Sequence, residues 1–434
     1  MRKRIKHENE NRTELKRNRK LKLLRTLGVW TLVSLILQFG FYYVFNQAVA
    51  KVMTPTSNQK TITATYESVL PDTSPENIQI SYAKDYLAYM SNGTFKVFNL
   101  KQNKVVFTKS RESGSDASMG VLNYHWLPDR NTLIYFFAKK NPKSNTTAAA
   151  PQTTTPKSPQ QQLEDPNAAK SPAVTKDPAA AKEAAGTAQG KAKETQTYQP
   201  QITELHSLEL PNSSEDTKPD ERQNMTVSDF PAGGKITRIA SSTYTNMIYL
   251  LVQSGTSVKL IQIDIMQDIT VLQRADETIM NITASDRNGT LYFESKTAKG
   301  KQILAIDSGI KRKTVSSDND YYILGDRAGN FYVGEIKNNR LVQVLTCKDS
   351  SEKDRQIELY PTWKGDIPYS KGQIGIDSSG KITIFENNTA YIITGGELKT
   401  KKISGQENYL SDDGAVYIQL THQNGGTKVN VKPL

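Results

Sequence analysis

The sequence contains few of the residues that most enzyme and metal sites need. Its 434 residues include a single cysteine, Cys347, so no intramolecular disulfide can form. The four histidines, His7, His125, His206 and His422, lack metal-ligand spacing. A nucleophile elbow, an H-E-x-x-H motif and a phosphate-binding P-loop are all missing. We therefore expect no catalytic, metal or cofactor site, and we expect Cys347 to be a buried thiol in a strand.

Basic residues are concentrated at the N-terminus. Residues 1–25 contain 11 of the 56 Lys and Arg residues but only three of the 44 acidic residues. Two-thirds of the formal net charge of +12 therefore lies in this segment, and the rest of the chain is nearly balanced. A short basic tail beside an apolar run is typical of a topology signal that contacts anionic lipid. We therefore expect no nucleic-acid partner.

The chain has one long apolar run. Residues 26–50 carry no charge, and about 20 apolar residues suffice to span the hydrocarbon core of a bilayer. We predict a signal-anchor helix that crosses the cell membrane once, preceded by a basic cytoplasmic tail over residues 1–25. The alternative is a cleaved signal peptide, because Ala48-Val49-Ala50 has the small-x-small form of a cleavage site. A stalk over residues 51–60 would then lead to an extracytoplasmic domain over residues 61–434.

The remaining sequence is predicted to be all β. Short segments of alternating apolar and polar residues are separated by turns of Gly, Asn, Asp and Ser. In the later copies the turn carries an Asp, expected to form local hydrogen bonds, and closes with a Gly, as in Asp286-Arg287-Asn288-Gly289. A β-rich stretch with a central marker residue follows each turn. The seven markers are Tyr89, Tyr135, Tyr249, Tyr292, Tyr332, Thr383 and Tyr417.

One interval between markers is much longer than the others. It contains residues 138–201, which are rich in Ala, Pro, Thr, Lys, Gln and Ser. Such a segment cannot bury enough apolar surface to offset the entropy of ordering it, so we predict a disordered insertion. Without the insertion the markers recur every 34 to 51 residues.

A repeat of 40 to 50 residues with four strands is typical of a β-propeller blade. We therefore predict an all-β propeller of about seven four-stranded blades, with six or eight as alternatives. The segment His125-Trp126-Leu127-Pro128-Asp129-Arg130-Asn131-Thr132-Leu133-Ile134-Tyr135-Phe136 resembles the W-S-P-D-G…L-x-F signature of TolB-like propeller repeats. In this chain Leu127 replaces Ser and Arg130 replaces Gly. The resemblance covers residues 60–434 and implies a propeller of the kind found in binding proteins and in non-catalytic domains of some peptidases.

The ring is expected to close by sharing one blade between the two ends of the chain, because an unclosed ring leaves exposed edges. The last blade supplies strands near 406–411, 415–421 and 427–433, and we predict Thr61–Tyr66 as its outer fourth strand. With strands labelled A to D from the axis outwards, the stalk then enters at the face of the A–B and C–D connections. The insertion follows a B strand and is predicted to leave from the opposite face, distal to the membrane.

A second long connection is predicted on the distal face. Pro361–Gly372 follows a predicted strand over Arg355–Tyr360 and would join strands D and A. Loops on rigid scaffolds often carry function, and clustered aromatic residues make recognition anchors. The alternative is that its two aromatic residues only plug the top of the propeller. The candidate binding residues are Trp363, Lys364, Asp366 and Tyr369.

These features favour a non-catalytic module that presents a binding or scaffold surface to an extracytoplasmic protein or a cell-envelope polymer. The alternative is a hydrolase or lyase that acts on carbohydrate or peptide with residues in the propeller channel. A close pair of carboxylates or a histidine cluster in the channel would favour the enzyme. A broad aromatic or apolar distal surface would favour binding.

Overall fold

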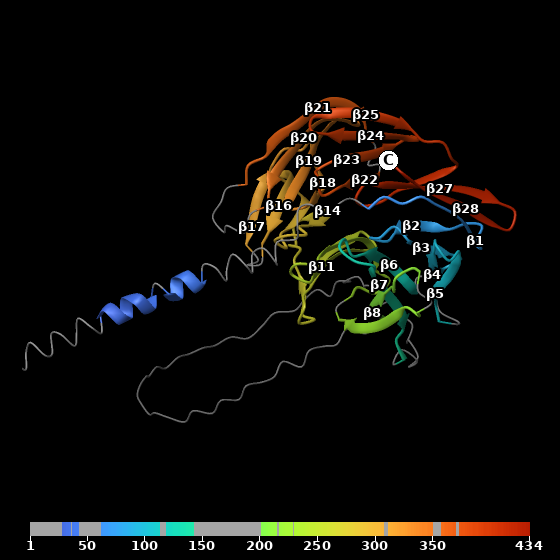
Figure 1. The fold of residues 1–434 in the computed structure, drawn as a ribbon, viewed down its shortest axis with the longest axis horizontal. Helices are drawn as coiled ribbons and strands as arrows, with labels where there is room; N and C mark the ends of the chain where they lie inside the picture. Colours follow the sequence, from blue (N-terminus) through green and yellow to red (C-terminus); the bar gives the residue numbers. More distant parts are fainter. Residues whose placement is uncertain are drawn as a thin grey trace, which may run out of the picture.

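The computed structural model describes residues 28–35, 37–42, 62–112, 119–142, 201–214, 217–228, 230–307, 311–349, 357–369 and 373–434. Within these ranges 28 strands form seven four-stranded antiparallel sheets (Figure 1). The prediction of an all-β propeller with seven blades is confirmed.

Six blades are formed by four consecutive strands each. Blade 1 consists of β2 (Glu76–Ile80), β3 (Tyr86–Ser91), β4 (Thr94–Asn99) and β5 (Lys104–Ser110). Blade 2 consists of β6 (Gly120–Trp126), β7 (Thr132–Lys140), β8 (Gln201–Glu209) and β9 (Asp220–Val227). Blade 3 consists of β10 (Lys235–Ser242), β11 (Met247–Ser254), β12 (Ser257–Ile263) and β13 (Ile269–Val271).

Blades 4 to 6 follow the same order. Blade 4 consists of β14 (Thr278–Ala284), β15 (Leu291–Thr297), β16 (Gly300–Ile306) and β17 (Arg312–Ser316). Blade 5 consists of β18 (Tyr321–Arg327), β19 (Asn330–Lys337), β20 (Arg340–Lys348) and β21 (Tyr360–Pro368). Blade 6 consists of β22 (Gln373–Ile376), β23 (Ile382–Glu386), β24 (Thr389–Thr394) and β25 (Glu397–Lys402).

The marker strands of the sequence repeat are the B strands, and the two faces of each B strand contact the two neighbouring blades. Because successive side chains of a strand point to opposite faces, each B strand contributes to two cores. In β15, for example, Leu291 and Phe293 pack against blade 3, whereas Tyr292 packs against blade 5. A buried hydrophobic cluster of this kind lies at each of the seven interfaces between blades. The core of the protein is therefore a ring of inter-blade layers.

Blade 7 joins the two ends of the propeller. Its strands A to C are β26 (Glu407–Leu410), β27 (Val416–Gln423) and β28 (Gly426–Pro433), and its D strand is β1 (Tyr66–Leu70), which pairs with β28. Closure by an N-terminal strand is as predicted, but its predicted position at Thr61–Tyr66 was wrong. Leu70 and Ser68 are buried in the structure. Burial of these two residues, rather than the β propensity of the preceding residues, determines which segment pairs.

An ion pair connects the first and last blades at the end of their A strands. The Lys84 ammonium lies 2.9 Å from an Asp413 carboxylate oxygen, and both side chains are largely buried. Burial alone would raise the pKa of Asp413, but the charge of Lys84 and hydrogen bonds from Ser411, Lys84 and the Ala415 amide lower it below its usual value. This pair supplements the β1–β28 pairing in holding the ring closed.

The recurring turn and marker motif forms contacts between blades. The Tyr249 hydroxyl of blade 3 donates a 3.3 Å hydrogen bond to the carbonyl of Gly289 in the turn of blade 4. Thr383 of blade 6 donates in the same way to Gly414 of blade 7. Gly289 has φ +71°, and a Cβ there would lie 2.4 Å from Thr245 of the preceding blade. Glycine is therefore required both by the backbone conformation and by the space available.

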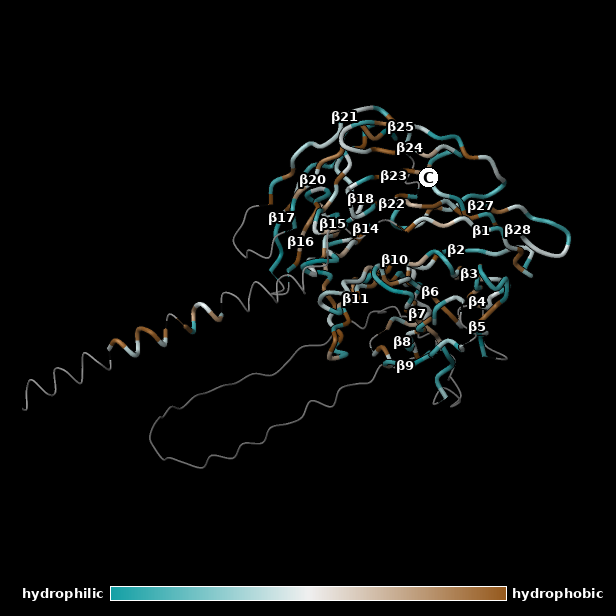
Figure 2. The backbone as a smooth tube through the Cα atoms, viewed as in Figure 1, coloured by the Kyte–Doolittle hydropathy of each residue, from teal (hydrophilic) through white to brown (hydrophobic). Residues whose placement is uncertain are grey.

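The predicted membrane helix reaches only partly into the described residues. Residues 28–35 and 37–42 are helical, and Figure 2 shows their apolar character. Their large apolar side chains are exposed, as in Trp30 and Phe39 with 67% and 72% exposure. Among the helical residues that the structure describes, none form a helix long and apolar enough to cross a membrane. The predicted tail (1–25) and stalk (51–60) lie outside the described residues.

The insertion has narrower boundaries than predicted. Strand β7 extends to Lys140 and strand β8 begins at Gln201, and these two residues are cross-strand partners. Residues 138–140 and 201, which were predicted to be part of the insertion, therefore belong to the blade. The insertion joins strands B and C of blade 2, as predicted, and residues 143–200 lie outside the described residues.

We predict that Lys84→Met lowers the free energy of unfolding by about 3–5 kcal/mol, because it leaves the Asp413 carboxylate buried without its partner. Urea unfolding followed by tryptophan fluorescence measures the loss. The matched control is Lys84→Met combined with Asp413→Asn, which removes the unpaired charge and retains an oxygen for the local hydrogen bonds. We expect the double variant to regain most of the lost stability. Equal stability of the two variants would show that the ion pair does not stabilise the contact between blades 1 and 7.

Candidate functional site: a polar funnel on the propeller axis

The four residues predicted to bind a partner do not form one surface. Trp363, Lys364 and Asp366 lie in β21, the outer strand of blade 5, so their placement in a D–A loop was wrong. Trp363 is buried against blade 6, while Lys364 and Asp366 are exposed and Asp366 pairs with Arg340. Tyr369 follows the strand and is buried. A binding role for Lys364 and Asp366 stays a prediction.

The turn-like composition of this segment has a simple explanation. Pro361 and Pro368 lie near the two ends of β21, which pairs with β20 on one side only. An edge strand tolerates proline because its outward amides make no ladder hydrogen bonds. Two register shifts between β20 and β21 also disturb the alternation of buried and exposed residues. The real D–A connection therefore begins only after Pro368, at Tyr369.

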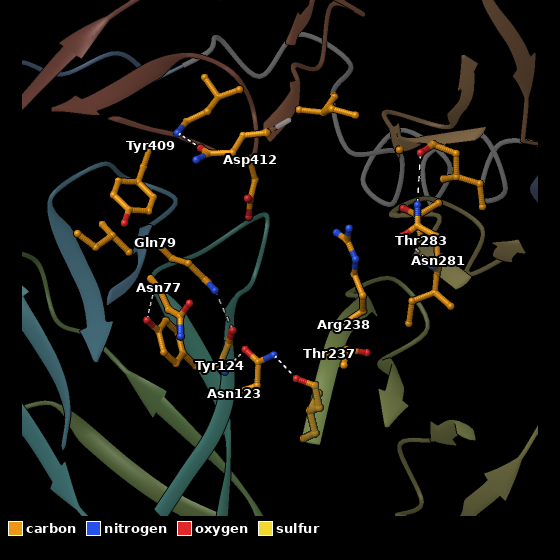
Figure 3. A pocket seen from close by; sticks show the side chains of 18 of the residues that line it. Asn77, Gln79, Asn123, Tyr124, Thr237, Arg238, Asn281, Thr283, Tyr409 and Asp412 are labelled. Atoms are coloured by element: carbon orange, nitrogen blue, oxygen red, sulfur yellow. Dashed lines mark hydrogen bonds between the residues drawn. The ribbon is translucent and has the colours of Figure 1, made fainter. Parts of the chain in front are cut away.

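A large cavity lies on the axis and is lined by residues in or next to the A strands of all seven blades. Its volume is about 960 Å³, at the upper end of the range of about 300–1,000 Å³ for ligand pockets. It opens at the face of the D–A and B–C connections, from which the insertion also leaves. Tyr369 is the one predicted site residue that lines it. The polar lining residues shown in Figure 3 are Asn77, Gln79, Asn123, Tyr124, Thr237, Arg238, Asn281, Thr283, Tyr409 and Asp412.

Side-chain amides connect the inner strands of neighbouring blades around this funnel. Gln79 donates to the Tyr124 carbonyl at 3.0 Å, and Asn123 donates to the Ile236 carbonyl at 2.8 Å (Figure 3).

Two further blades repeat the contact. Asn281 donates to the Ile323 carbonyl at 3.4 Å, and Gln373 donates to the Asn408 carbonyl at 3.3 Å. Each amide thus satisfies a main-chain carbonyl of the next blade. We call these four residues the amide ladder, and we infer that it keeps the wall of the funnel in place.

Charged and phenolic groups give the funnel a defined electrostatic character. Glu294 is buried, accepts a 2.7 Å hydrogen bond from the Ile323 amide and lies 3.7 Å from the Lys301 ammonium. Burial raises the pKa of Tyr369 to about 12, with a further increase from Glu294 and an opposing decrease from the nearby positive charge of Arg238. The Tyr369 hydroxyl therefore keeps its proton at physiological pH and is able to donate a hydrogen bond.

A smaller cavity of about 230 Å³ lies at the other end of the channel, where the A strands end. Its lining includes His125, Asp286, Asp326 and Asp412. Burial lowers the pKa of His125, although the charge of Asp412 opposes this change. Within the described ranges, no group of three His, Cys, Asp or Glu residues is arranged to hold a metal ion.

Asp326 is the most strongly perturbed acid of this cavity. Both oxygens of its carboxyl group are shielded from solvent. Burial raises its pKa well above the usual value, and the neighbouring charges of Asp286 and Asp349 raise it further. Asp286 itself accepts hydrogen bonds from the Ala328 and Gly329 amides of the next blade. These acids therefore belong to a contact between blades 4 and 5.

Cys347 has the structural role expected from the sequence. It lies in β20, is buried, and belongs to the hydrophobic cluster between blades 4 and 5. Burial and the charges of Asp326 and Asp349 raise the pKa of its thiol to about 12. The thiol is therefore protonated and unreactive at physiological pH.

Comparison with known proteins adds the following. No protein-family model matches the chain, and no match is found among curated proteins. Among solved structures, the β-propeller domain of Cps50 (Swd1) from Myceliophteria thermophila aligns with a TM-score of 0.44 at 10% identity, over 86% of this chain and 100% of that chain. Hydrazine synthase from Kuenenia stuttgartiensis gives 0.41 at 11% identity, over 86% and 97%. The Dos1 propeller gives 0.42 at 8% identity, over 83% and 78%.

The raised pKa of Asp326 predicts a pH-dependent stability. Below the usual pKa of an aspartate the carboxyl group is protonated in both states. As pH rises towards the folded-state pKa, the unfolded chain has already released this proton, so the free energy of unfolding falls. Asp326→Asn removes the effect, and we expect it to gain stability over the wild type progressively between pH 4 and pH 8.

Thermal unfolding of both proteins across this pH range measures the difference. The matched control is Asp276→Asn, at an exposed position. A difference between Asp326→Asn and wild type that does not change with pH would contradict the prediction.

Proposed function

We propose that this chain is a membrane-anchored, extracytoplasmic binding module that holds its ligand in the polar funnel. The observation that carries the proposal is the 960 Å³ cavity on the axis, lined by hydrogen-bonding side chains from every blade. The ring of inter-blade cores and the amide ladder hold these side chains on a rigid scaffold. A preformed site of this kind binds without the cost of ordering its wall.

The route of the chain supports an orientation for the funnel. Strand β1 is an outer strand, so the preceding chain enters at the face of the C–D connections. The funnel opens at the opposite face, together with the D–A and B–C connections. Anchoring by residues 26–50 would therefore direct the funnel away from the membrane, towards envelope material. The exposed apolar side chains within residues 28–35 and 37–42 and the basic segment before them support the anchor.

The alternative function, a hydrolase or lyase with residues in the channel, has weaker support. Asp286 and Asp326 line the smaller cavity, and Asp326 is shielded from solvent. Asp286 is occupied by amides of the next blade. In the funnel itself, Glu294 is already engaged by Lys301 and the Ile323 amide. These groups stabilise the propeller, so we place the binding module first.

The orientation is tested by protease access in intact cells. A cleavage site is inserted in the connection between Lys140 and Gln201, and a second is placed before residue 26 as the matched control. We expect an added protease to cut the first site in intact cells and the second only after lysis. Cleavage of the first site only after lysis would contradict an extracytoplasmic propeller.

The funnel is tested with two methionine variants of the full-length chain in detergent. Met280 lines the funnel and is 38% exposed, whereas Met266 is 76% exposed in the C–D connection of blade 3. We expect Met280→Trp to fill part of the funnel and to lower the binding of envelope polymer or protein by at least about tenfold. Met266→Trp should bind as the wild type does. Equal binding by both variants, with equal melting temperatures, would place the ligand elsewhere.

A further inference from the structure

Blade 3 departs from the pattern of the amide ladder. The A strands β6, β10, β14 and β18 each contain a bulge, and the residue after the bulge is Asn123, Arg238, Asn281 and Gly325 in turn. Asn123 and Asn281 use their amides to bond the next blade. Arg238 occupies the same position but makes no side-chain hydrogen bond or ion pair within the described residues. The bulge turns its guanidinium into the cavity (Figure 3).

The charge of Arg238 is uncompensated on the funnel wall. It is the only Lys or Arg among the described residues that line the cavity. The acidic lining residue Glu294 is already paired with Lys301. Glu76 and Asp412 belong to blades 1 and 7, on the other side of the ring, and form no ion pair with Arg238 in the described part of the chain. A guanidinium with free donors in a recessed site suits a carboxylate or phosphate, which it binds through two parallel hydrogen bonds.

The surroundings of Arg238 favour a hydroxyl-rich ligand over an apolar peptide. Thr237, Thr283 and Tyr322 lie on the same wall, and the Tyr369 phenol is near enough to Arg238 for the positive charge to lower its pKa. Hydroxyl groups both donate and accept hydrogen bonds, as sugar hydroxyls do. Peptide recognition depends on apolar and aromatic anchors buried in pockets. Among the described lining residues, Met280 is the only large apolar side chain with substantial exposure.

We infer that the funnel binds an acidic glycan and that Arg238 pairs with an anionic group of that polymer. This inference rests on the proposed binding function of the funnel. The anionic group is a carboxylate or a phosphate, which share the geometry that a guanidinium recognises. Glu76 and Asp412 repel a second anion from the far wall, so the charged group is directed to blade 3 and the hydroxyl groups to the remaining polar lining.

The test uses the full-length chain in detergent and four defined probes in calorimetric titration. Tetragalacturonate carries carboxylates, its methyl ester is the matched neutral control, a phosphodiester-linked mannose oligomer carries phosphates, and tetraglutamate represents an acidic peptide. We expect one of the two anionic polymers to bind more tightly than the methyl ester and tetraglutamate. The Arg238→Gln variant should weaken this binding by about ten- to a hundredfold, and Arg238→Lys should lie in between.

Folding and the proposed function are controlled separately. Arg238→Gln should melt at the wild-type temperature, because Arg238 has no partner in the described residues to lose. Preferred binding of tetraglutamate, or affinity for the anionic polymers that Arg238→Gln does not change, would overturn the inference. If the methyl ester or tetraglutamate binds best and Met280→Trp abolishes that binding, the funnel remains the site and only the acidic glycan is refuted. If none of the four probes binds, the acidic glycan is refuted. The proposed function also fails if Met280→Trp leaves the binding of envelope polymer and protein unchanged.

Discussion

The structure depends on the pairing of β1 with β28. A propeller of seven blades has a hydrophobic layer at every interface, and each layer needs a blade on both sides. Without the N-terminal strand, β28 would be left as an exposed edge and the layer between blades 7 and 1 would lose Leu70. Once β1 is in place, the positions of all A strands around the axis follow, and with them the shape of the funnel.

The polar groups on the axis have two different roles. The inner strands cannot complete their hydrogen bonding with neighbours inside the blade, because nothing pairs with their inner edge. Four side-chain amides supply some of these hydrogen bonds by donating to main-chain carbonyls of the next blade: Gln79, Asn123, Asn281 and Gln373. Arg238, at an equivalent bulge, does not. A recognition site requires a rigid polar wall and a polar group that is available to a ligand. Arg238 is such a group among the described residues, and this contrast underlies the function proposed above.

Local sequence patterns were sufficient for the elements in the middle of each blade. Residues such as Leu291, Tyr292 and Phe293 alternate between two buried interfaces, so their strand could be predicted from composition and spacing. The turns that carry an Asp and close with a Gly were also recognisable, because Gly289 and Gly414 need a positive φ and lie close to the preceding blade. The same reasoning failed at the edges. Pro361 and Pro368 looked like loop residues because an edge strand tolerates proline, and Thr61–Tyr66 looked like a strand because its residues have high β propensity.

The sequence by itself determined the repeat, the fold class and the connection that carries the insertion, because each follows from contacts between residues close in the chain. It left six to eight blades open, and the structure fixed the number at seven. Only the tertiary structure decided the register of β1, the burial of Trp363 and the position of Arg238 on the funnel wall. These depend on which residues of distant blades meet around the axis. A single polar residue after a bulge, such as Asn123 or Arg238, has no local pattern that reveals whether its side chain bonds the neighbouring blade or remains free for a ligand.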